Sequence, residues 1–283
     1  MVNFLTTLYQ NLRRRWFYGL MALMVAMGVV VTTPAPAPAI SWLDLIFRGV
    51  QIIQLSSLSD RQEVSLGGQI NEQLVGEEFT LYNNASVNNY VRQIGQRLVP
   101  YSTRPDIPYT FQVVQDEQIN AFATMGGYVY VTTGLIEAAD NEAQLASVIA
   151  HEIGHIAGRH AVEQMREMAI ASGVATAAGL DQNAAVGIGV ELALRRPNSR
   201  QDEYEADQLG LQTLTEAGYA PSGMVAFMEK LLGRSSIPAF LSTHPATSNR
   251  IERLNEMIDP ATANSGAGLD EATYQRQIRP LGS

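Results

Sequence analysis

The sequence predicts an α+β fold that is mostly helical around a small antiparallel sheet, and two observations support this. Residues 109–114 and 128–132 alternate in polarity and are rich in β-branched or aromatic residues, which is typical of strands. Helical spacing dominates after Gly134, over about residues 141–165, 199–217, 221–233 and 247–259. With 283 residues, 46% of them hydrophobic, the chain can bury the core that such a fold needs.

The first 39 residues have the organisation of an export signal. Residues 13–15 are arginines, an apolar run follows over 16–31, and Ala37-x-Ala39 provides a small-residue exit. We expect cleavage near Ala39 or, alternatively, an uncleaved membrane anchor, because the run is long for a signal and short for a spanning helix. Either outcome predicts that the following domain is exported, to the periplasm or to a membrane-associated position outside the cytoplasm.

The domain after the signal is expected to span residues 40–260. Residues 41–55 have the spacing of an amphipathic helix that docks on the domain or lies on a membrane surface. Two further helices are predicted within residues 60–100, the second with Ser86 as a cap. Gly126-Gly127 predicts a turn before the strand at 128–132, with residues 121–124 as an additional extended piece.

Two segments have unusual composition. Residues 168–194 are nearly all Ala, Gly, Val, Ile and Leu, which favours either a loosely packed helical hairpin or a mobile cover over a neighbouring site. Residues 261–283 begin with Ala, Gly, Ser and Asn and are expected to form a flexible tail.

The charge and the residue usage exclude several classes of function. A net charge of −9 and a pI near 5.0 argue against nucleic acid as a partner, since phosphate binding needs a basic face. The chain has no cysteine, which excludes disulfides, thiol catalysis and cysteine-ligated zinc.

Residues 151–155 read His-Glu-Ile-Gly-His. Two histidines at i and i+4 project from one face of a helix, so His151 and His155 can reach the same metal ion. Glu152 lies beside that face and can take a proton from a metal-bound water. Gly154 is costly inside a helix, and a close approach to a neighbouring element or to the metal explains it.

Two histidines leave a metal site incomplete, so a third ligand is needed. His160 would point away from His151 on a continuing helix, and we interpret it as a capping or packing residue. Glu203 and Asp207 lie at i and i+4 on a later helix, where one can bind the metal and the other can hold a ligand imidazole. A merely solvated acidic face is the alternative.

Three motifs in this order resemble the zinc metalloproteases of peptidase family forty-eight, the gluzincin group with the HtpX, BepA, LoiP and Oma types. They are His-Glu-Ile-Gly-His-Ile-Ala-Gly-Arg-His at 151–160, Ser199-Arg200-x-x-Glu203-x-x-Ala206-Asp207, and Ser242-Thr243-His244-Pro245 followed by Arg250-Ile251. The resemblance runs from about Arg61 to Ile258. It implies a zincin-like metalloprotease domain with one Zn²⁺ per chain.

The resemblance also implies residue roles. His151, His155 and Glu203 would bind the zinc, Glu152 would be the catalytic base, and Asp207 would partner His151. His244 would approach the metal, as an oxyanion donor or a fourth ligand, unless it only caps the helix near Thr247. Arg250 would orient His244 or bind the substrate backbone. Residues Asn120, Ala121, Phe122 and Ala123 resemble the edge that receives an extended substrate, with an ordinary internal strand as the alternative.

The expected function is that of a zinc metalloendopeptidase acting on polypeptides, with unfolded or misassembled envelope proteins as substrates and protein quality control as the role. The alternative is a zinc-binding chaperone or interaction protein of the same fold without turnover. The intact Glu152 argues against that alternative.

Overall fold

The computed structural model describes residues 52–53, 57–171, 180–195, 197–245 and 248–282, all within the unit Gln51–Ser283. The predicted export signal or anchor and most of the predicted helix at 41–55 lie outside these residues. At the end of that stretch, β1 (Ile52–Ile53) pairs with β5 (Leu180–Asp181), so the helix prediction is wrong at these two positions. In the part of the chain that is described, no helix combines the length and the hydropathy that crossing a bilayer requires.

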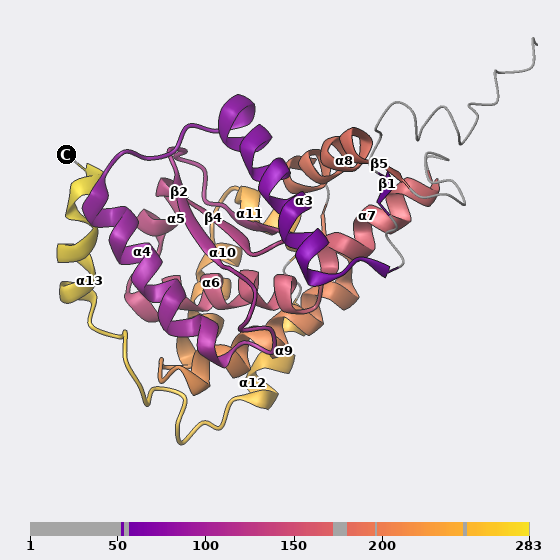
Figure 1. Cartoon of the computed structure of the whole chain (residues 1–283). Helices are drawn as coiled ribbons and strands as arrows, with labels where there is room; N and C mark the ends of the chain where they lie inside the picture. Colours follow the sequence, from indigo (N-terminus) through magenta and orange to yellow (C-terminus); the bar gives the residue numbers. More distant parts are fainter. Residues whose placement is uncertain (1–51, 54–56, 172–179, 196, 246–247, 283) are drawn as a thin grey trace, which may run out of the picture. The chain divides into compact units, whose positions relative to one another are not determined.

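Helices make up most of the described structure (Figure 1). The long ones are α3 (Asp60–Gln73), α4 (Ala85–Leu98), α6 (Glu142–Ala157), α7 (His160–Ala171), α8 (Gln182–Arg195), α9 (Arg200–Glu216), α10 (Ser222–Leu232) and α12 (Ser248–Met257). Shorter ones are η2 (Leu74–Glu78), η3 (Val99–Tyr101), α5 (Thr133–Ala138), α11 (Ala239–Thr243), α13 (Glu271–Ile278) and η4 (Arg279–Gly282). This confirms the mostly helical α+β class.

The main sheet has three strands in the order β2-β4-β3. β3 (Ala121–Thr124) and β4 (Tyr128–Thr132) form the expected antiparallel hairpin, whose turn holds Gly126 and Gly127 at φ 79° and 98°. β2 (Thr110–Val114) pairs with β4 in parallel, so the sheet is mixed and not antiparallel as predicted. The reason is that β3 reverses the chain, and β4 then runs beside β2 in the same direction.

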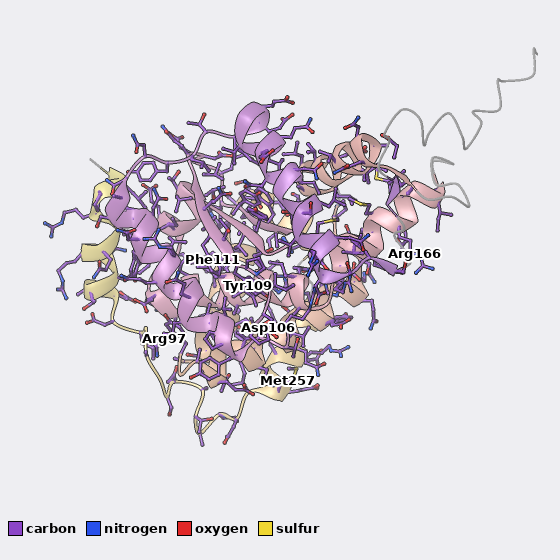
Figure 2. All side chains as sticks on the ribbon, in the orientation of Figure 1. Arg97, Asp106, Tyr109, Phe111, Arg166 and Met257 are labelled. Carbon is purple, nitrogen blue, oxygen red and sulfur yellow. The ribbon has the colours of Figure 1, made fainter. Side chains whose placement is uncertain are left out.

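The helix α4 packs on the sheet through a close contact with β2. Tyr109 and Phe111, labelled in Figure 2, stack with centroids 6.2 Å apart. A Cβ at Gly95 would lie 2.4 Å from the Phe111 ring, so the glycine lets α4 approach the strand. The N-cap of α4 is Asn84, whose side chain accepts from the amides of Ser86 and Val87; Ser86 is therefore inside the helix and is not its cap.

The helix α6 lies in the middle of the fold and packs against α9, α10, α4, β3 and β4. The sequence predicts one helix over 141–165, but the structure breaks it after Ala157, and α7 begins at His160. Arg159 adopts a left-handed conformation at the break, with φ 58°. α7 then packs against α8, as the helical-hairpin interpretation of residues 168–194 requires, and α8 also contacts α3 and β3.

Residues 263–278, here called the C-terminal strap, are ordered, in contrast to the predicted flexible tail. Backbone amides of Ala143, Ala220 and Ser222 donate to carbonyl oxygens of the strap at 2.9–3.1 Å. In α13, Tyr274 is 1% exposed, and its hydroxyl donates to the Ile136 carbonyl at 2.6 Å. The strap therefore belongs to the same core as α6, and Figure 1 shows α13 beside α4.

Candidate metal centre

The helix α6 presents His151 and His155 on one face, and both side chains are buried. Their Nε2 atoms lie 3.1 Å apart, as the i and i+4 spacing predicts for two imidazoles aimed at one point. The helix begins at a side-chain cap from Asn141 and is almost entirely buried along its length, which fixes the two imidazoles in the interior.

The helix α9 brings Glu203 to the same point. Its carboxylate oxygens lie 3.5 Å from His151 Nε2 and 3.3 Å from His155 Nε2. Small residues make this approach possible, because a Cβ at Gly154 would lie 2.6 Å from the carbonyl oxygen of Ala206. This confirms the prediction that Gly154 permits close contact with a neighbouring element.

His244 follows α11 and completes the cluster. Its Nδ1 lies 3.1 Å from Glu203 Oε1, 3.2 Å from His155 Nε2 and 3.3 Å from His151 Nε2. In the described residues, ligand atoms of these four side chains all lie within 4.8 Å of one another. Three imidazoles and one carboxylate, with no sulfur, are a donor set that suits a tetrahedral Zn²⁺.

Glu152 lies next to the cluster and is fully buried. Its Oε1 is 3.5 Å from His244 Nε2, and neither carboxylate oxygen has a hydrogen-bond partner in the described structure. Burial raises the pKa of its carboxyl group. A buried carboxylate without a hydrogen-bond partner, beside four side chains that could hold a metal ion, is suited to exchanging a proton with a bound water or substrate.

Asp207 and Arg250 form the next layer around the ligands. Asp207 Oδ1 lies 3.1 Å from His151 Nδ1, the nitrogen that faces away from the cluster. Arg250 donates to both Asp207 oxygens at 2.6 and 2.7 Å, to Glu203, and to the His244 carbonyl at 3.4 Å. Arg250 is buried among these partners, with 2% of its surface exposed.

These contacts shift the pKa values of the clustered side chains. Burial alone would lower the pKa of His151, but Asp207 and Glu203 raise it to about 9. Burial opposes ionisation of Asp207, yet hydrogen bonds from Arg250 and His151 lower the pKa of its carboxyl. The pKa of Glu203 is likewise lowered, against burial, by the surrounding imidazoles. Burial lowers the pKa of His155, which favours the neutral form that binds a metal.

The comparison with protein families now decides the classification. The model described as "Peptidase family M48" matches residues 85–258, which contain the whole cluster. The chain belongs to peptidase family M48. Membership implies a metal cofactor for the M48 domain, and the residues at the cluster fit one.

Known relatives agree with this classification. The "Beta-barrel assembly-enhancing protease" of Escherichia coli K12 is 33% identical over 248 residues, 80% of this chain and 50% of that protein. A "Putative beta-barrel assembly-enhancing protease" of Vibrio cholerae is 34% identical over 76% of this chain and 48% of its own length. The "Mitochondrial metalloendopeptidase OMA1" of Schizosaccharomyces pombe is 30% identical over 61% and 53%. The chain thus spans about half the length of these relatives.

An open cavity adjoins the candidate metal centre of the M48 domain. Its volume is about 680 Å³ when the solvent space at its mouth is included. Its lining includes Glu152, His155 and His244, and it includes Phe122 and Ala123 of the edge strand β3. The other two predicted substrate-binding residues do not line it. Ala121 is fully buried, and Asn120 pairs with β4, because its carbonyl accepts from the Thr132 amide at 3.0 Å.

Asn198 and His160 lie near the candidate metal centre, although the sequence predicts no role for either residue there. Asn198, just before α9, has its Nδ2 3.1 Å from His244 Nδ1 and 3.4 Å from His155 Nε2. Gln164 donates to Asn198 Oδ1 at 2.7 Å, which turns the amide nitrogen toward the cluster. His160 lies behind His155, with 2.8 Å between their Nδ1 atoms. No local sequence pattern indicates that Asn198 lies at the cluster. For His160, the preceding Gly158 is a sequence signal of a helix break.

Proposed function

We propose that this M48 domain is a zinc-dependent metalloendopeptidase that cleaves unfolded or misassembled proteins of the cell envelope. The observation that carries the proposal is the position of Glu152. It is a buried carboxylate without a hydrogen-bond partner, beside four side chains that could hold a metal and at the wall of an open cavity. A site that only stored a metal would need the ligands but not this carboxylate.

The roles of the individual residues follow from their places. His151, His155 and Glu203 would hold the ion, with Asp207 orienting His151 through its Nδ1. When bound, zinc supplies a Lewis acid that polarises the scissile carbonyl and makes the attacking water acidic. Glu152 accepts the proton of that water and delivers it to the leaving amine. Phe122 and Ala123 place the edge strand β3 along the cavity, where an extended substrate can pair with it.

His244 is proposed to control access to this site. Its Nδ1 lies among the ligand atoms, where it can supply the fourth ligand of a tetrahedral zinc. A substrate carbonyl would need an open position on a bound zinc, so His244 would have to withdraw before the substrate could bind. After withdrawal, the same imidazole can donate to the oxyanion that forms during hydrolysis. The α7–α8 pair, which forms part of the cavity wall, is proposed as the cover that moves with it.

The place of action is proposed from the N-terminal signal pattern together with the relatives. Residues 1–39 carry the features of an export signal or anchor. A bacterial relative is named for enhancing β-barrel assembly, a process of envelope proteins. We therefore propose an exported protein, in the periplasm or attached to a membrane, whose substrates are polypeptides that fail to fold or assemble there.

The substitution Glu152→Gln tests the enzymatic proposal. Glutamine keeps the size of the side chain but cannot accept the proton, so we expect wild-type zinc content and a loss of hydrolysis of at least about 10²-fold. The measurements are zinc per chain by elemental analysis and kcat/KM on unfolded casein. His155→Ala is the matched comparison, because it should lose zinc and hydrolysis together.

Turnover by Glu152→Gln at the wild-type rate would refute this mechanism. Zinc binding without any turnover by the wild-type protein would instead favour the chaperone or interaction function. In that case the protein should still suppress aggregation of the casein, in wild type and Glu152→Gln alike.

The substitution His244→Ala separates its two proposed roles. Zinc should stay bound, because His151, His155 and Glu203 remain. Faster cleavage of unfolded casein would show that His244 acts mainly as a plug, whereas a loss of about 10²-fold in kcat/KM would show that it acts mainly as an oxyanion donor. Wild-type rate together with wild-type zinc affinity would mean that His244 has neither role.

A further inference from the structure

The most informative contact outside the cluster joins His160 to the metal-ligating His155. Their Nδ1 atoms lie 2.8 Å apart, and both side chains are buried, with 5% and 6% exposed. The rings meet nearly edge to face, with centroids 5.0 Å apart. His160 is not among the residues that could hold the metal, so it touches the ligand from behind.

A break in the helix produces this contact. On a continuous α-helix His160 would be rotated by about 140° from His155 and would point away from it. The left-handed Arg159, with φ 58°, instead turns the start of α7 back over the end of α6. Arg159 is held in this position by Glu63 at 3.1 Å and by the Leu58 carbonyl at 2.6 Å.

The glycine before the break is also required. A Cβ at Gly158 would lie 2.5 Å from His160 Nε2 and 2.8 Å from its Cε1. A side chain at residue 158 would therefore force the His160 imidazole to move. The contact with His155 thus depends on three consecutive residues, Gly158, Arg159 and His160.

The metal-binding role of His155 decides the direction of the hydrogen bond. His155 Nε2 faces the cluster, so its lone pair must be free for a metal, and the neutral ring must carry its proton on Nδ1. Nδ1 of His155 is therefore the donor and Nδ1 of His160 the acceptor. The proton of His160 is then on Nε2, which lies 3.5 Å from Glu205 Oε2.

We propose that His160 is a positioning residue for the metal: by accepting the Nδ1–H of His155 it fixes the tautomer and the orientation in which His155 binds. It does for His155 what Asp207 does for His151, with a neutral imidazole in place of a carboxylate. The inference rests on the proposed metal site and extends it to a residue that binds neither metal nor substrate.

The test compares His160→Asn with His160→Leu in the full chain. The two replacements have nearly the same shape, but only asparagine offers an acceptor near the position of Nδ1. Zinc affinity is measured by competition with a chromogenic chelator, and the unfolding temperature of the metal-free protein is recorded in parallel. We expect His160→Leu to bind zinc 10- to 100-fold more weakly, roughly the loss typical of an outer partner, and His160→Asn to recover most of the affinity.

Two glycine variants provide an independent comparison. Gly158→Ala should weaken zinc binding because it displaces the His160 ring, whereas Gly187→Ala on α8, with no atom within 4 Å of the new Cβ, should not. Equal zinc affinity in wild type and His160→Leu would overturn the proposal. So would an equal loss in His160→Leu and His160→Asn, because a lost acceptor would then not be the cause. A wild-type protein that binds no zinc would refute the proposed function itself.

Discussion

Two buried carboxylates, those of Asp207 and Glu203, face two buried basic side chains, those of Arg250 and His151. Against the effect of burial, Arg250 and the imidazoles lower the pKa of Asp207 and of Glu203, and these carboxylates raise the pKa of His151 to about 9. A divalent ion can bind only if His151 releases its proton, because the imidazole must be neutral to act as a ligand. Metal binding and proton release at His151 are therefore linked.

This linkage predicts how the stability of the metal-free protein depends on pH. The pKa of His151 is raised from 6.5 to about 9, so its proton is bound more tightly in the folded state. That contribution is complete below pH 6.5 and disappears as the pH rises through about 9. We expect a loss of up to about 3 kcal/mol in the free energy of unfolding across this window.

Urea unfolding in the presence of a chelator, at a series of pH values across this window, measures the effect. His151→Gln is the control and should show a flatter profile, because the titrating group is gone. His155 does not interfere, since its pKa is lowered and its effect falls below pH 6.5. If wild type and His151→Gln lost the same stability toward pH 9, the raised pKa would not be responsible.

For single residues, the sequence predicts those contacts that follow from the spacing of side chains along one helix. The i and i+4 pairs identify His151 with His155 and Glu203 with Asp207, and the structure brings all four together. The place of Asn198 depends on a loop outside any periodic pattern, so spacing could not reveal it. His160 was interpreted as a packing residue because an unbroken helix was assumed, and the left-handed Arg159 invalidates that assumption.

Among the elements, the contact between α6 and α9 decides whether the ligands meet. Gly154 faces the Ala206 backbone, and a Cβ at Gly210 would lie 2.9 Å from His151 Cα. We expect Gly154→Ala to destabilise the protein by about 1–3 kcal/mol, because backbone atoms cannot move aside as a side chain can. Zinc affinity should fall as well, because the displaced helix carries Glu203.

Gly76→Ala in η2 is the comparison for this prediction, because nothing lies within 4 Å of the Cβ it would add. Chemical unfolding and chelator competition on both variants measure the two effects. Unchanged zinc affinity in a destabilised Gly154→Ala protein would show that the helix spacing does not control the position of Glu203.

The predicted elements agree with the structure where their pattern is local. Helical spacing locates α9, α10 and α12, and the two glycines at 126 and 127 mark the hairpin turn. The parallel pairing of β2 with β4 was missed, because strand order depends on contacts between distant segments. The cap of α4 was misplaced by two residues, since Asn84 and Ser86 are both good capping residues.

For the whole molecule, the C-terminal strap attaches its helix α13 to the centre of the fold. Tyr274 packs in the same core as α6 and is hydrogen-bonded to the Ile136 carbonyl. We expect Tyr274→Ala to lower the free energy of unfolding by about 3–5 kcal/mol, as for other large buried aromatic side chains. Urea unfolding is the measurement.

Tyr101→Ala is the control for the strap, because this tyrosine is 43% exposed and should cost far less. Similar stability of Tyr274→Ala and Tyr101→Ala would mean that the strap adds little to the core. The composition of the tail predicts disorder over residues 261–283, but backbone groups of Ala263, Ala267 and Gly268 find partners in the turn at 218–222 and at Ala143. Such partners lie far away in the sequence, so composition could not predict them.

The strap also bears on the order in which α6 acquires its contacts during synthesis. All four ligating residues and Glu152 lie before residue 245, and a ribosome makes them well before the strap. The first turn of α6, however, receives its contact at Ala143 from Gly268, which is translated after all of them. The helix that carries His151 and His155 therefore acquires its final packing only after Gly268 has emerged. This order delays the completed packing of the candidate metal centre until the strap has been translated.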